Sequence, residues 1–347
     1  MDESKNISSL HNKERSARAF RSKKEERRYW IMLITFFALG VLATYGLLVY
    51  GNPVPITSSS FLPVVRRRMI AIGAMIIAAV CQSMATVAFQ SSTNNRIITP
   101  SLLGFEALYT TLHTCIMFFF GIRVFINMTN SVGAFVLQVA IMVLLCLILY
   151  GWLLAGKYGN LQLMLLIGII IGTGLRSVSA FMRRMLIPSE FDILQARSFG
   201  SVNNADVRYF PIAIPIVVVA AVLIYLYAKK LNVLSLGKGA STSLGVNNKA
   251  GTIYVLVLVA ILMSISTALV GPLTFYGFLV ATLTYQAVPT YDHRYIFPMA
   301  LVLGFLIITS AYFLMNHVFQ AQGVVSIIIE MFGGIVFLVV LLRKGTL

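Results

Sequence analysis

Ten apolar runs, each near the length that crosses a lipid bilayer, dominate this chain of 347 residues. A transmembrane helix needs about 20 consecutive apolar residues, and it satisfies its own backbone hydrogen bonds because lipid offers no partners. We therefore predict an all-α fold, a polytopic membrane protein with about ten transmembrane helices. The predicted helices cover residues 29–50, 69–89, 100–120, 132–152, 161–180, 209–228, 251–270, 273–287, 297–315 and 325–342.

The composition supports a membrane environment. Hydrophobic residues make up 59% of the chain and charged residues only 11%, whereas a soluble domain carries about 25% charged residues. The formal net charge of +16 could suggest a nucleic-acid partner. However, the basic residues lie in short loops between apolar runs, which is typical of membrane topology. We expect the lipid bilayer as the surroundings and no nucleic acid as a partner.

The distribution of positive charge predicts the orientation. Residues 1–28 hold nine Lys/Arg and five Asp/Glu, and we predict a cytoplasmic basic tail there, ahead of a membrane domain over residues 29–347. The first apolar run lacks a small-residue cleavage site, which favours a retained helix over a removed signal peptide. With the N-terminus inside, cytoplasmic segments hold eighteen Lys/Arg and outer segments eight. This excess predicts that both termini are cytoplasmic.

Arg66, Arg67 and Arg68 stand out among the outer basic residues because they oppose this topological bias directly before the second predicted helix. We interpret them as a docking surface for an outer partner, and the alternative is an anchor to lipid phosphates. Four further arginines flank the loop before the sixth predicted helix: Arg183, Arg184, Arg197 and Arg208.

Signatures of catalysis and of metal binding are missing from the sequence. It has no Gly-x-x-x-x-Gly-Lys-Ser/Thr phosphate loop, no Gly-x-Ser-x-Gly elbow and no paired catalytic carboxylates. The four histidines are scattered without metal-ligand spacing, and the three cysteines fall within apolar runs. We expect no metal site, no cofactor on this chain and no enzymatic activity.

Three ionisable residues lie within predicted helices, where charge costs at least about 2.5–3.5 kcal/mol to insert. Glu106 and Arg176 are predicted to line a translocation path, in which Arg176 would attract an anionic cargo. The alternative for Arg176 is a side chain that extends to the membrane interface. Glu330 is expected to pair across helices, and His113 shares a helix face with Glu106 because seven residues separate them.

Two polar segments interrupt the apolar pattern. Residues 90–104 form a short polar break with Pro100 and Gly104, which a membrane tolerates only where protein or water surrounds it, so we predict a gate. Residues 229–250 carry four lysines and no acid. We predict two short helices there, lying along the membrane as a docking surface.

These segments carry a family resemblance. Asn95 followed by Pro100-Ser101-Leu102-Leu103-Gly104, after a helix that ends in Gln90, resembles the FecCD-type permeases, the membrane subunits of ABC importers for iron–siderophore complexes, haem and cobalamin. Three further segments match the family in order: 231–247, 271–278 and Gly333-Gly334 through Arg343. The resemblance implies the type II ABC importer permease fold in a bacterial cytoplasmic membrane.

The resemblance also implies roles for particular residues. The inner gate would comprise Asn95, Arg96 and Ile97, with Gly159, Asn160 and Leu161 as its counterpart. The coupling loop would contact one of two separate ATPase subunits, which bind ATP and Mg²⁺, while a siderophore-binding protein, extracellular or periplasmic, docks outside. The coupling residues implied by the match are Leu234, Leu236, Gly237, Ala240, Ser243, Leu244 and Gly245.

Departures from the family pattern narrow the resemblance. The usual Arg-Leu-Pro-Arg is Arg68-Met69-Ile70-Ala71, the usual Pro-His is Ala281-Thr282, and the usual Leu-Pro-Val-Gly is 323–326, Gly-Val-Val-Ser. They resemble the ferric-siderophore branch, with catecholate and petrobactin systems, that pairs two different, paralogous permeases. The alternatives are a haem or cobalamin permease and a self-contained secondary transporter that uses Glu106 and Glu330 as coupling carboxylates. The coupling loop argues against the latter.

Overall fold

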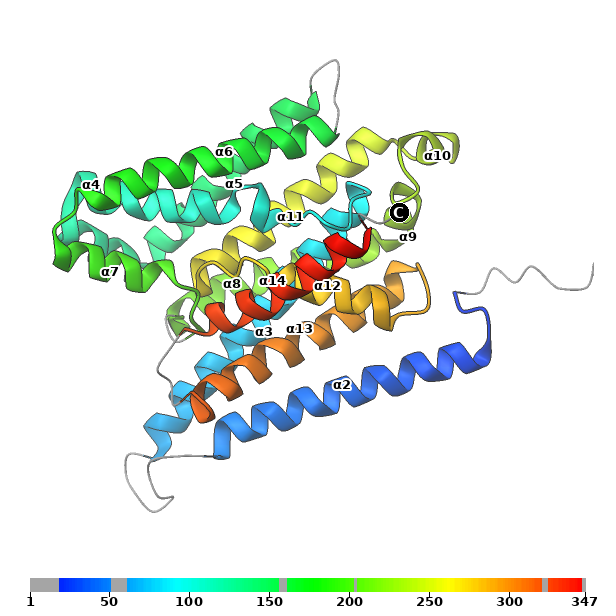
Figure 1. Ribbon diagram of the computed structural model, residues 1–347, viewed down its shortest axis with the longest axis horizontal. Helices are drawn as coiled ribbons and strands as arrows, with labels where there is room; N and C mark the ends of the chain where they lie inside the picture. The colour runs from blue at the N-terminus through cyan, green and yellow to red at the C-terminus, as the bar shows by residue number, and fades with distance from the viewer. Residues whose placement is uncertain (1–18, 51–60, 156–160, 203–204, 320–323, 345–347) are drawn as a thin grey trace, which may run out of the picture.

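The computed structural model describes residues 19–50, 61–155, 161–202, 205–319 and 324–344. Within these ranges the regular structure is entirely helical, which confirms the all-α prediction. The axes of most of the long helices are roughly parallel or antiparallel, and the helices lie side by side (Figure 1). The predicted gate residues Gly159 and Asn160 and most of the predicted N-terminal tail lie outside the described residues.

Each of the ten predicted runs contains a helix. The helices are α2 (Lys23–Val49), α3 (Phe61–Ser92), η1 (Pro100–Leu103), α4 (Phe105–Thr129), α5 (Val132–Ala155), α6 (Leu161–Arg184), α7 (Pro188–Ser198), η3 (Val207–Tyr209), α8 (Phe210–Leu226), α9 (Ala228–Leu234), α10 (Lys238–Ser243), α11 (Asn248–Val270), α12 (Tyr276–Ala287), α13 (His293–His317) and α14 (Val325–Lys344).

The length of one helix differs from the prediction. Seven helices of the described chain are long and apolar enough to cross a membrane, and α5 and α14 add 24 and 20 residues. By contrast α12 has only 12 residues, about 18 Å at 1.5 Å per residue, against a hydrocarbon core of about 30 Å. The helix predicted over 273–287 is therefore present but shorter than expected, because Gly271-Pro272 forms a non-helical break and the helix begins only at Tyr276.

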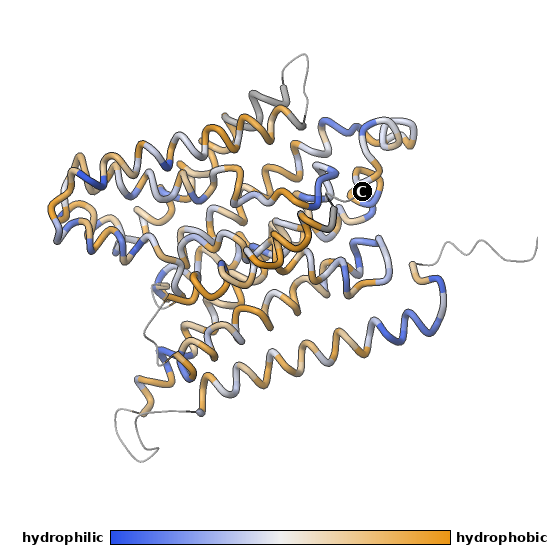
Figure 2. Tube along the Cα trace, in the orientation of Figure 1, coloured by the Kyte–Doolittle hydropathy of each residue, from blue (hydrophilic) through white to orange (hydrophobic). Residues whose placement is uncertain are grey.

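Helices α3 and α11 occupy the centre of the bundle, packed against each other and surrounded by α5, α8, α12 and α13. Helix α2 lies at the periphery against α13, with most of its apolar residues exposed (Figure 1). Apolar residues cover the shafts of the helices while hydrophilic residues gather toward their ends (Figure 2). This distribution suits a bundle that exposes its sides to lipid.

Close packing at the centre depends on glycines. A Cβ atom at Gly277 of α12 would collide with the Thr86 hydroxyl of α3, and one at Gly304 of α13 would collide with the Ser83 hydroxyl. Small residues at such crossings let membrane helices approach closely, because packing replaces the hydrophobic effect in lipid. The centre of the bundle is therefore held by contacts that leave no room for larger side chains.

The bundle has two distinct ends. At one end, called here the α7 end, lie α7 and the termini of α4 and α6 that contact it; at the other, the α10 end, lie α9, α10 and the start of α2 (Figure 1). The start of α2 and the end of α14 both lie at the α10 end (Figure 1). There the Tyr29 hydroxyl donates to the Tyr295 carbonyl at 2.9 Å, which attaches the start of α2 to α13.

Candidate functional site

A cavity of about 400 Å³ opens toward the α7 end, between α4, α6, α7 and α14 and the break after α11. It brings together the two residues predicted for the translocation path, Glu106 and Arg176, and adds Glu330. The other residues of its lining that matter below are Arg183, Gln195, Ser198 and Thr274. Ionisable side chains from three separate helices thus share one chamber inside an otherwise apolar bundle.

Glu106 binds the broken backbone between α11 and α12. Its carboxylate accepts hydrogen bonds from the Leu273 amide at 3.2 Å and from the Thr274 hydroxyl at 2.7 Å. Glu106 is buried, and burial of a carboxylate is tolerated only with such partners. The Thr274 hydroxyl also lies 3.3 Å from Glu330 Oε1, so it stands between the carboxylates of α4 and α14.

Two glycines position Glu106 beside α6. Gly104, between η1 and α4, adopts a φ of +107°. Residues that carry a Cβ atom rarely enter this region of backbone conformation. A Cβ atom on Gly104 would lie 3.3 Å from the Gly172 Cα atom, and one on Gly172 would lie 3.1 Å from the Gly104 Cα atom. This contact brings the start of α4, with Glu106 in its first turn, against the helix that carries Arg176.

Arg183 holds α7 against the cavity. Its guanidinium donates to the Thr114 hydroxyl at 3.2 Å, to Gln195 Oε1 at 3.2 Å and to the Ser198 hydroxyl at 2.7 Å. Sequence reasoning treated this arginine as part of a loop and missed α7 as a helix. The signal was present: Pro188 stands at the first helical position, Glu190 in the first turn and Arg197 in the last.

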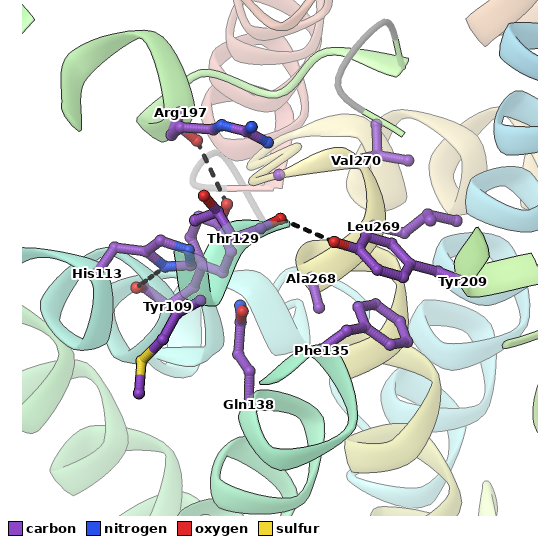
Figure 3. Close-up of a pocket in the computed structure, with 12 residues that line it drawn as sticks. Tyr109, His113, Thr129, Phe135, Gln138, Arg197, Tyr209, Ala268, Leu269 and Val270 are labelled. Atoms are coloured by element: carbon purple, nitrogen blue, oxygen red, sulfur yellow. Dashed lines mark hydrogen bonds between the residues drawn. The ribbon is translucent and has the colours of Figure 1, made fainter. Parts of the chain in front are cut away.

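A separate, smaller cavity lies near this chamber, and Figure 3 shows its lining. His113, Tyr109, Arg197 and Tyr209 line it, and its volume of about 30 Å³ is enough for about one water molecule. His113 Nδ1 bonds the carbonyl of Tyr109 within its own helix at 3.0 Å. His113 and Glu106 share a helix face as predicted, yet they line different cavities.

The predicted docking arginines occupy two different environments. Arg66, Arg67 and Arg68 lie within α3, not before it, because this helix already begins at Phe61. Arg66 and Arg67 are exposed. Arg68 instead donates to the carbonyls of Leu47 and Leu48, both at 2.9 Å, and so satisfies the end of α2.

The predicted gate loop is a compact turn at the α10 end. The Asn95 side chain accepts from the amides of Ile97 at 2.9 Å and Ile98 at 3.3 Å. The side-chain amide of Gln90 donates to the Arg96 backbone carbonyl at 2.8 Å. The Arg96 guanidinium lies 4.6 Å from the centre of the Tyr285 ring of α12. Of the predicted counterpart loop, Leu161 is described only as the first residue of α6.

The predicted coupling loop forms two short helices, α9 and α10, as expected. Leu236 and Leu244 are 60% and 61% exposed, and Ala240, Ser243 and Gly245 are exposed beside them. Gly237 and Gly245 have φ values of +92° and +77° at the start of α10 and just after its end. Leu234 is fully buried, so it supports the loop from inside and presents no surface to a partner.

Comparison with known proteins agrees with this arrangement. Residues 30–343 match the FecCD transport family. The chain is 71% identical, over 98% of its length and 96% of the relative's, to the petrobactin import system permease protein FatC of Bacillus anthracis. It is 35% identical to the petrobactin import system permease protein YclO of Bacillus subtilis, covering 80% and 88% of the two chains. A petrobactin import permease named FatD, from Bacillus anthracis, is 26% identical over 52% and 53%.

The fold has a solved counterpart. A structure described as an inward-facing conformation of a putative metal-chelate type ABC transporter superposes with a TM-score of 0.77, covering 90% of this chain and 99% of the other at 17% identity. The chain belongs to the FecCD transport family. It is a multi-pass membrane permease of a bacterial ABC importer and not an enzyme, and the alternative of a self-contained secondary transporter is therefore set aside.

Proposed function

We propose that this permease carries iron–siderophore complexes of the petrobactin type across the bacterial cytoplasmic membrane. The observation that carries the proposal is the 71% identity to a petrobactin import permease across 98% of the chain. Haem and cobalamin are alternative cargoes within the resemblance, and no comparable sequence identity supports either of them. The chemistry of the α7-end cavity agrees, because the exposed Arg176 and the half-buried Arg183 offer positive charge to an anionic chelate.

The working complex, in this proposal, contains a second, paralogous permease. The relatives support it, since FatC and FatD are both named as permeases of a petrobactin import system. The chain would lie with its α10 end and both termini in the cytoplasm, where its positive charge is concentrated. The α7-end cavity then faces outward, toward a docked siderophore-binding protein.

Energy would come from two ATPase subunits that hold ATP and Mg²⁺. The sequence has no phosphate loop of its own, and the α10 end presents an exposed, lysine-bearing surface with Leu236 and Leu244. In this proposal, movement of this surface opens the gate loop at Asn95, Arg96 and Ile97. The cargo then passes from the cavity lined by Glu106 and Arg176 into the cytoplasm.

Uptake by the reconstituted complex tests the proposal. The permease pair, the ATPase and the binding protein are placed in sealed vesicles with internal ATP, and uptake of radioactive iron as ferric petrobactin is measured beside haem and cobalamin. We expect ATP-dependent uptake of the ferric siderophore alone. Faster uptake of haem or cobalamin would overturn the cargo, and an active complex with two copies of this chain would overturn the paralogous partner.

A further inference from the structure

A hydrogen-bonded chain of three side chains connects the α9 helix to the end of α3. Asn232 of α9 accepts from both the backbone amide, at 2.9 Å, and the Nδ1 atom of His293, the first residue of α13. The other ring nitrogen of His293 lies 2.6 Å from the hydroxyl of Ser91, in the last turn of α3. His293 and Ser91 are both buried, and all three side chains border a cavity of about 550 Å³ that Asn94 and Arg96 of the gate loop also line.

The partners determine where the protons lie. The Asn232 Nδ2 atom donates to Asp292 Oδ1 at 3.1 Å, which leaves its Oδ1 atom as the acceptor that faces His293. Burial alone would raise the pKa of Asp292, but hydrogen bonds from Arg294 outweigh it and keep that pKa low, so the carboxylate stays ionised. Nδ1 of a neutral His293 therefore carries the proton, and Nε2 accepts from Ser91. In this arrangement His293 Nδ1 donates to Asn232 and the Ser91 hydroxyl donates to Nε2.

The two ends of this chain lie at the predicted coupling loop and beside the predicted gate loop. Asn232 belongs to α9, which packs against the exposed helix α10. Ser91 lies in the turn that leads into the gate loop, where the Asn94 amide reaches the Ser91 carbonyl at 3.4 Å and the Asn95 amide reaches the Gln90 carbonyl at 3.0 Å.

We propose that Asn232, His293 and Ser91 are positioning residues that transmit displacement of the α9–α10 surface to the gate loop. The inference rests on the proposed function, because it needs an ATPase that moves the surface and a gate that opens. The hydrogen bonds carry movement because stretching them would leave the buried His293 and Ser91 side chains without their partners. If the link is broken, the ATPase still hydrolyses ATP, but the gate opens less often for each ATP that is hydrolysed.

Two neighbouring serines allow a matched test. Ser91 bonds to His293, whereas Ser92, which is also buried, bonds to the carbonyl of Phe89 in its own helix at 3.0 Å. Ser91→Ala and Ser92→Ala are each placed in the full complex in vesicles, and iron uptake and ATP hydrolysis are measured together. We expect Ser91→Ala to lower the iron transported per ATP about fivefold, the effect of one lost hydrogen bond, and Ser92→Ala to leave it unchanged.

A second pair covers the case in which Ser91→Ala does not assemble. His293→Asn keeps a nitrogen donor near Nδ1 for Asn232 but cannot reach Ser91. His317 is the matched control, since it lies at the other end of the same helix and bonds the carbonyls of Phe313 and Tyr50, both at 3.0 Å. We expect His293→Asn to reduce iron per ATP and His317→Asn to leave it unchanged.

The outcomes separate the two proposals. If wild-type complex does not take up ferric petrobactin, the proposed function fails. If wild type transports and Ser91→Ala matches Ser92→Ala, or if uptake and hydrolysis fall in the same proportion, the transmission by these three residues is refuted while the function stands.

Discussion

The Thr274 hydroxyl donates to the buried Glu106 carboxylate at 2.7 Å, and this contact joins the first turn of α4 to the non-helical break between α11 and α12. The same carboxylate receives the Leu273 amide. A residue that the sequence suggests for transport is therefore also a structural support, because it satisfies backbone that no helix satisfies.

Removal of the Glu106 carboxylate should destabilise the protein. Glu106→Ala leaves the Leu273 amide without its acceptor and the Thr274 hydroxyl with only its longer contact to Glu330, and an unsatisfied buried group costs about 1–3 kcal/mol. Glu106→Gln keeps one acceptor oxygen and should retain most of the stability. Glu330→Ala is the control, since Glu330 is less buried and holds only the longer contact with Thr274. Thermal unfolding in detergent measures all three, and equal losses for Glu106→Ala and Glu330→Ala would contradict the assignment.

Arg176 should act on cargo and not on docking. Its side chain is exposed to the α7-end cavity, so Arg176→Ala should reduce uptake of an anionic chelate while association of the binding protein stays unchanged. Arg176→Lys keeps the charge and should retain more uptake. Arg184, exposed on the same helix outside that lining, is the matched control, and its alanine variant should transport normally. Equal uptake by the two alanine variants would place the cargo path elsewhere.

The three arginines of α3 should separate into two roles. Reversal of Arg66 and Arg67 to glutamate should slow association of the binding protein and flatten its salt dependence, because opposite potentials act mainly on encounter rate. Either single reversal should do little, since an exposed charge pair contributes roughly 0–1 kcal/mol. Arg68→Ala should instead lower the unfolding temperature, because the Leu47 and Leu48 carbonyls lose their donor. Association kinetics at low salt and thermal unfolding distinguish these effects.

The crossing of α3 and α13 should not tolerate a larger residue. Gly304→Ala places a methyl group against the Ser83 hydroxyl and should cost about 1–3 kcal/mol of stability, as overpacking does. Adding Ser83→Ala removes the colliding oxygen and should restore part of the loss. Gly334→Ala, with open space around its Cβ position, should be neutral. A Gly304→Ala protein as stable as wild type would show that this contact relaxes freely.

The turn that follows α10 should be needed for coupling to the ATPase. Gly245 has a φ of +77°, and its amide and that of Val246 close the turn on Thr242 and Ser241 at 3.0 and 2.9 Å. Gly245→Val strains this backbone, since β-branched residues avoid positive φ, and should lower iron transported per ATP. Gly239→Ala, inside α10 with open space and ordinary φ, is the control. The ratio of uptake to hydrolysis in the reconstituted complex is the measurement.

Much of the fold could be predicted because hydropathy alone governs which segments enter lipid. The ten apolar runs, the break at 90–104 and the two short helices of the coupling loop are local patterns, readable without knowing what they contact. The roles assigned to the gate and coupling residues rest on the resemblance and stay predictions.

Tertiary structure alone decided which residues meet. Hydropathy is additive along the chain, whereas a hydrogen bond such as that from Thr274 to Glu106 joins residues 168 positions apart and depends on how helices cross. For the same reason the sequence predicted one shared role for the three α3 arginines, whereas in the folded protein Arg68 bonds to the end of α2. The sequence also could not predict the contact between Ser91 and His293, since this contact arises where α3 and α13 cross at buried, polar positions.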